Sequence, residues 1–152
     1  MMWLYVLSLI KENGSEIPLA ADKSLGLAMS GINRVVITNK ENAKVECLNE
    51  AFNRFIFMYG GHIFMIRRYD IRSTTLVSIT SRIASKINMS ENLCAIHDSE
   101  TKSLEFIKRT ISINSINTDE NGTRTVKGTI PNVKAIGDDT EETYYVRTFR
   151  IK

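Results

Sequence analysis

The sequence predicts a single α+β domain over residues 1–152, built from an N-terminal β-hairpin, a helical middle and a C-terminal antiparallel β-meander. Strand-forming segments gather at both ends of the chain, and apolar residues in the middle recur every three or four positions. Strands at the ends with helices between them favour α+β over alternating β-α units. The length of 152 residues and a composition of 43% hydrophobic and 24% charged residues suit one domain.

The N-terminal segment predicts a hairpin. Trp3 to Ile10 is a continuous apolar run, as expected for a strand buried on both faces. Asn13-Gly14 is the sequence preferred by a type I′ turn, and Pro18 places the returning strand, Ser15 to Leu19, at a sheet edge. The apolar run is too short to cross a bilayer and has no preceding basic residues. We therefore expect a cytoplasmic protein without membrane contact.

The middle of the chain predicts helices. Asp22 is placed to cap a short helix over residues 23–29, and a brief strand follows at residues 34–38. Residues 42–59 form the strongest helical pattern, because their apolar side chains recur at spacings of three and four. In an alternative interpretation, Arg54–Tyr59 and His62–Arg67 form a hairpin that turns at Gly60-Gly61.

A further helix is predicted after Ser73, which would cap it. Leu76, Ile79, Ile83 and Ile87 would then lie along one side, although the β-branched residues between them disfavour a helix. The last third is rich in Ile, Thr, Val, Tyr and Phe and predicts the four strands of the meander. These strands are Leu93–His97, Leu104–Ile116, Thr123–Ile130 and Thr143–Ile151.

No pattern in the sequence predicts a catalytic, metal or cofactor site. The 2 His and 2 Cys have no metal-ligand spacing. Asn117 to Gly122 matches the first half of a calcium loop, but Gly128 stands where the closing carboxylate is needed, so a hairpin turn is favoured. The carboxylates of residues 138–142 predict a solvated loop. Ser99-x-x-Lys102 lacks the companion motifs of penicillin-recognising enzymes.

Basic and aromatic residues support a second hypothesis. Alternation in the last strand places Tyr145, Arg147 and Phe149 on one side and Arg150 on the other. A sheet face that combines aromatic rings with arginines can bind single-stranded nucleic acid. In the simpler interpretation, Tyr145, Phe149 and Ile151 are the core face and the arginines lie at its rim. The candidate nucleic-acid residues are Arg67, Arg68, Arg147 and Arg150.

Taken together, these patterns favour a structural or assembly protein that is not an enzyme and that acts through protein–protein contacts or self-assembly. Its Ser- and Thr-rich strands are suited to adding to the sheet of a neighbour. Abundant Ile, Asn, Lys, Ser and Thr are encoded by A/T-rich codons, which favours a phage or mobile-element component, located in the virion if so. Nucleic-acid binding is the alternative, and the net charge of +3 permits it without requiring it.

Overall fold

The computed structural model describes residues 2–34, 46–51, 54–71, 75–85, 89–130 and 141–151. These residues form two antiparallel five-stranded sheets and two short α-helices, so the predicted α+β fold with a helical middle is wrong. Two compact units are present, Met1–Thr75 with Arg150–Lys152 and Leu76–Phe149. The expectation of a single domain stays a prediction. No helix in the described part of the chain is long and apolar enough to span a membrane.

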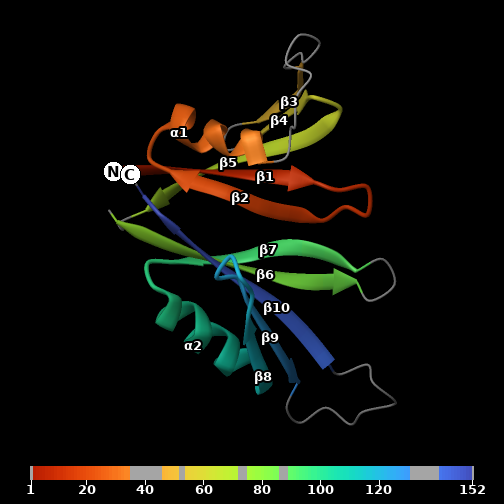
Figure 1. The fold of residues 1–152 in the computed structure, drawn as a ribbon, viewed down its shortest axis with the longest axis vertical. Helices are drawn as coiled ribbons and strands as arrows, with labels where there is room; N and C mark the ends of the chain where they lie inside the picture. Colours follow the sequence, from red (N-terminus) through yellow and green to blue (C-terminus); the bar gives the residue numbers. More distant parts are fainter. Residues whose placement is uncertain are drawn as a thin grey trace. The chain divides into compact units, whose positions relative to one another are not determined.

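The first unit contains a sheet with the strand order β2-β1-β5-β4-β3 (Figure 1). A short α-helix and a 3-10 helix, Ser30–Arg34, follow its first hairpin. The predicted strand at residues 34–38 begins inside that 3-10 helix and otherwise lies outside the described residues. The elements are β1 (Met2–Ile10), β2 (Glu16–Asp22), α1 (Leu25–Met29), β3 (Glu46–Ala51), β4 (Arg54–Tyr59) and β5 (His62–Ile71).

The predicted N-terminal hairpin is confirmed, but its turn differs from the prediction. β1 lies between β2 and β5, and β2 is an edge strand whose register shifts beside Pro18. Gly14 has a positive φ of 86° and its N–H donates to the carbonyl of Lys11. Asn13 has no positive φ, so the turn is not type I′. The short helix is also confirmed, with Ser24 rather than Asp22 as its N-cap.

The helix predicted over residues 42–59 is wrong where the structure describes it, because residues 46–51 and 54–59 are strands; residues 42–45 and 52–53 lie outside the described residues. The alternative hairpin is correct. β4 and β5 pair from Arg54↔Arg67 to Tyr59↔His62. Gly60 and Gly61 have positive φ values of 60° and 79°, as a two-residue type I′ turn requires. Aromatic and β-branched residues fit a half-buried pleated surface, and here this preference outweighs the helical spacing.

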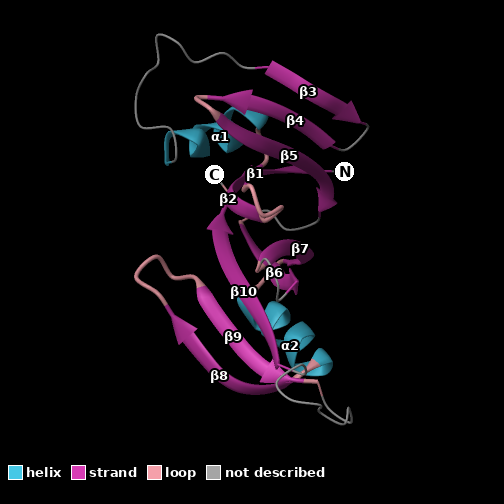
Figure 2. Cartoon of the chain, turned by 90° about the vertical axis from the view of Figure 1, so that its right-hand side faces the viewer, coloured by secondary structure: helices cyan, strands magenta, loops and turns pink. Residues whose placement is uncertain are grey.

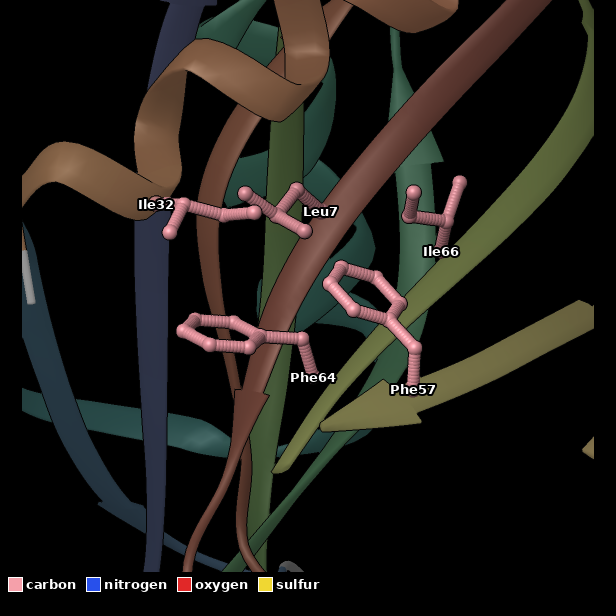
Figure 3. Close-up of a cluster of buried hydrophobic side chains, with 5 residues drawn as sticks. All are labelled: Leu7, Ile32, Phe57, Phe64 and Ile66. Atoms are coloured by element: carbon pink, nitrogen blue, oxygen red, sulfur yellow. The ribbon is translucent and has the colours of Figure 1, made fainter. Parts of the chain in front are cut away.

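The core of the first unit lies between one face of the sheet and the helical segment. Five apolar side chains are buried together on this face: Leu7, Ile32, Phe57, Phe64 and Ile66 (Figure 3). The rings of Phe57 and Phe64 are stacked, with their centroids 5.5 Å apart. Leu7 is completely buried and contributes from β1, an interior strand of the sheet. Ile32 brings the 3-10 helix onto this face, so the helical segment is held by apolar contact.

The second unit contains a sheet with the order β7-β6-β10-β9-β8 (Figure 1). The helix predicted after Ser73 is wrong, because residues 76–85 form a strand; Ser73 itself lies outside the described residues. Val77, Ser78, Ile79 and Thr80 are all buried, so both faces of this strand are covered. The elements are β6 (Leu76–Ser85), β7 (Ser90–His97), α2 (Glu100–Thr110), β8 (Ser112–Thr118), β9 (Arg124–Thr129) and β10 (Glu141–Arg150).

Three of the four strands predicted for the meander form, as β7, β9 and β10, but β7 pairs with β6, so the predicted meander is wrong; residues 104–116 are not one strand. The first part of that segment belongs to α2, whose N-cap Ser99 accepts a hydrogen bond from the backbone N–H of Lys102 (3.2 Å), and the second part forms β8. Ile107 and Ile111 pack from the end of this helix against β9 and β10. The apolar contact explains why the helix forms despite the strand-forming composition of the segment.

Candidate functional site

Arg67 and Arg68, two of the residues proposed to bind nucleic acid, leave opposite faces of β5. Arg67 Nε donates to both carboxylate oxygens of Glu16, at 2.9 and 3.1 Å, and Glu16 is buried. The guanidinium of Arg68 instead lies 4.2 Å from the ring centroid of Trp3, as in a cation–π contact. These two arginines therefore do not form one basic surface.

Tyr69 lies near the Arg67–Glu16 ion pair. Burial raises the pKa of Tyr69 to about 12, with a smaller lowering by Arg67 and a smaller raising by Glu16. The phenol is consequently neutral at physiological pH. Arg67 and Glu16 are therefore ion-paired with each other, and Tyr69 beside them is partly buried. Such an arrangement is typical of a structural network rather than of a surface that binds phosphate.

Arg147 in β10 is also engaged within the protein. Its Nη1 donates to Oε2 of Glu91 at 2.6 Å, and its Nη2 to Oε1 at 3.4 Å, with side-chain exposures of 17% and 6% for Arg147 and Glu91. Its guanidinium also lies 5.4 Å from the ring centroid of Tyr145. Arg150 is exposed, and strand alternation directs it away from Arg147.

The core face of β10 is the side opposite to the one predicted. Tyr144 and Val146 are buried against α2 and β9, whereas Tyr145 and Phe149 are half-buried. The aromatic residues proposed for base stacking therefore share a face with the Arg147–Glu91 ion pair. Of the three residues that the simpler interpretation assigns to the core, Ile151 is buried, whereas Tyr145 and Phe149 are half-buried, and Arg147 on the same face is paired.

Several of the acidic candidates have structural partners where they are described. Residues 138–140 lie outside the described ranges, and Glu142 pairs with Arg82 at 3.2 Å. Within the described ranges, no group of three or more His, Cys, Asp and Glu residues is placed to hold a metal ion. The calcium-loop candidate is a hairpin turn, in which the N–H groups of Asn121 and Thr123 donate to Oδ1 of Asp119.

Cys94 and Ser99 show no sign of activation as nucleophiles. The Cys94 thiol donates to the carbonyl of Thr80 at 3.4 Å, and burial raises its pKa, which favours the unreactive protonated form. Ser99 Oγ accepts the capping hydrogen bond of α2. His97 Nδ1 lies 3.2 Å from Ser103 Oγ, so this imidazole is also held by a helix residue.

The most open feature of the second unit is the edge strand β8. It is the last strand of its sheet, beside β9, and within the described part of the chain no strand pairs with its other side (Figure 2). Its residues are exposed except for Ile113, which is half-buried. Its sequence, Ser-Ile-Asn-Ser-Ile-Asn-Thr, contains no charge and no proline. Sequence reasoning missed this site, because it assigned residues 104–116 to one long strand.

The other three edge strands carry features that disfavour pairing with another chain. β2 contains Pro18 and a register shift, and β3 contains Glu46 and Glu50. β7 contains Glu91 and is irregular at two places along its pairing with β6. Charges, proline and irregularities are the usual protection of exposed edges. β8 has one such feature, a register shift between Ile113 and Ser115.

The register shift in β8 has a consequence for packing. Ile113 lies opposite Gly128 and Ile116 lies opposite Val126, so the extra residue, Asn114, brings both isoleucines to the same face. Ile113 packs at the core, whereas Ile116 is 43% exposed. β8 thus combines backbone groups that pair with no further described strand with an apolar side chain that the described residues of the unit leave partly exposed.

No protein-family model, curated protein or solved structure matches this chain.

Proposed function

We propose that this chain is a non-catalytic structural or assembly protein that acts through protein–protein contacts, with β8 as the attachment point. The observation that carries the proposal is the exposed edge of β8, which has no charge and no proline. A strand added there would pair with its backbone N–H and C=O groups and cover Ile116. A phage or mobile-element origin, with the protein in the virion, remains the proposal favoured by the composition.

Nucleic-acid binding is less well supported by the contacts of the candidate arginines. Arg67 and Arg147 are each bonded to a buried glutamate, so a phosphate group would have to displace Glu16 or Glu91. Displacement would leave a carboxylate in a desolvated place without that arginine, at a cost of several kcal/mol. Arg150 is exposed, but one arginine gives little of the multiple phosphate neutralisation that such binding uses.

Photo-crosslinking in the cells that produce the protein tests this proposal. A photoreactive phenylalanine derivative replaces Ile116 in β8, and the control carries it at Asn121, which is exposed in the turn after β8. We expect protease-sensitive adducts from position 116 and few from position 121. Nuclease-sensitive adducts in their place, an equal yield at both positions, or no adduct at position 116 would contradict the proposal.

A further inference from the structure

We infer that the partner strand is β8 of a second copy of this chain, and that two copies pair their β8 strands antiparallel about a two-fold axis. The inference rests on the proposed function and identifies the partner at the same strand. Two five-stranded sheets would then join into one continuous sheet. Such an interface is isologous, so the same strand has to be complementary to itself.

The side chains of β8 satisfy this requirement of self-complementarity. A two-fold axis places a residue near its centre opposite its own copy, and a charged residue there would face the same charge. β8 has no charged residue from Ser112 to Thr118. Its Ser, Asn and Thr side chains both donate and accept hydrogen bonds, so each can pair with an identical side chain. Among the described strands, β1 and β8 are free of charge over their whole length, and of these two β8 lies at an edge of its sheet.

The charges that flank β8 favour the antiparallel direction. Lys108 and Arg109 lie in the last turn of α2, the helix that precedes β8, and Asp119 and Glu120 directly follow β8. All four residues are exposed. Antiparallel pairing brings the basic end of one copy to the acidic end of the other, twice in each dimer. Parallel pairing would bring the like charges together at both ends.

The register shift limits where the axis can lie. Beyond the bulge, Ser115 to Thr118 pair regularly with Lys127 to Arg124 of β9, so their other side presents a regular row of backbone groups. Ile116 belongs to this segment, and pairing across it would cover its exposed surface. Because the regular segment is short, we expect a dimer that dissociates on dilution rather than an obligate one.

Size-exclusion chromatography with light scattering tests the dimer. For the purified chain, the mass is expected to rise with concentration from 17.2 kDa toward twice that value. Ile116→Lys places two like charges across the axis and should hold the mass at that of one chain. Asn92→Lys adds the same charge at an exposed position of β7, at the other edge of the sheet, and should dimerise as the unmodified chain does. A monomer at about 100 µM, where a micromolar Kd would give mostly dimer, would overturn the inference.

Disulfide trapping tests the direction of pairing. In a Cys47→Ser, Cys94→Ser background, single cysteines are placed in turn at positions 115 to 118. Only residues near a two-fold axis face themselves, so we expect one position of highest yield, with lower yields on either side. Equal yields at all four positions would indicate parallel pairing and contradict the two-fold arrangement.

A charge exchange adds a test of the flanking residues. Arg109→Glu should weaken the dimer, and Arg109→Glu with Glu120→Arg in the same chain should restore it, because both ends of the interface regain opposite charges. Failure of the double variant to recover any affinity would contradict the antiparallel arrangement of these ends.

The outcomes for the partner and for the proposed function are distinguishable. A purified chain that stays monomeric, together with a cellular adduct from position 116 to a different protein, overturns self-pairing and leaves the assembly function standing. A nuclease-sensitive adduct overturns the assembly function itself. An adduct of two copies of the chain, combined with the dimer in solution, supports both.

Discussion

Replacing Gly128 by alanine should destabilise the second unit through the pairing of β8 with β9. A β-carbon at Gly128 would clash with the carbonyl oxygen of Ser112, and would lie 2.9 Å from the carbonyl carbon of Ser112 and 2.8 Å from Cδ1 of Ile111. The side-chain atom can move, but the backbone of Ser112 is fixed by its position opposite Thr129. The first residues of β8 would therefore have to separate from β9.

The expected cost follows from these contacts. Overpacking a close-fitting site costs about 1–3 kcal/mol, and the loss of one or two ladder hydrogen bonds adds about 1 kcal/mol each. A total of roughly 2–4 kcal/mol would lower the Tm by about 5–15 °C for a chain of this size. Thermal and urea unfolding followed by circular dichroism would measure both quantities.

A second glycine in the chain supplies the matched control. A β-carbon at Gly26, in α1, would meet only Ser24 Oγ at 3.7 Å, so Gly26→Ala should leave stability unchanged or raise it by up to about 1 kcal/mol. If Gly128→Ala changed stability by less than about 0.5 kcal/mol, the size of an ordinary surface substitution, the close approach of β8 to β9 would be refuted.

Three further predictions concern the two units. Leu7→Asp should prevent folding, because it brings an unpaired charge into the apolar cluster of a completely buried residue; a soluble variant with an unchanged Tm would contradict this. Stability should fall as pH rises from about 10 to about 12, because the unfolded chain ionises Tyr69 at its ordinary pKa of 10.0 while the folded chain keeps it neutral up to about 12; Tyr69→Phe should reduce this fall in alkaline urea titrations. Arg147→Ala should cost about 3 kcal/mol in urea unfolding by removing the bidentate partner of buried Glu91, whereas Arg150→Ala, at an exposed position, should cost less than about 0.5 kcal/mol; equal effects would refute the role of the ion pair.

The elements that the sequence predicted correctly are those with local chemical signals. The hairpin of β1 and β2 has a continuous apolar run, a glycine at the turn and Pro18 at the edge. The Asn13-Gly14 and Asn121-Gly122 turns also formed where they were expected, although in both the glycine alone has a positive φ. A local signal therefore places a turn without fixing its type, which depends on the loop length and on the twist of the flanking strands.

The elements predicted wrongly have apolar spacings that fit both a helix and a strand buried on both faces. Apolar residues in β4 and β6 recur at intervals of three and four, the spacing of a helix. Both strands are nevertheless covered on both faces, to differing degrees, so apolar side chains point to each side. A strand buried on both faces loses the alternation that distinguishes it from a helix. The β-branched residues of β6 were the better evidence, because they report backbone preference independently of periodicity.

The position of the candidate site depends on information that no local pattern contains. Ile113 and Ile116 are three residues apart, a spacing that would place them on opposite faces of a regular strand. The bulge at Asn114 instead brings both to the same face. Whether such a strand is an edge is decided by the order of the sheet, in which β10 enters between β6 and β9 from the far end of the chain. If β8 were an internal strand, its uncharged sequence would be ordinary. At an open edge, the same sequence exposes Ile116 and a row of backbone groups, and that combination is why we place the protein–protein contact there.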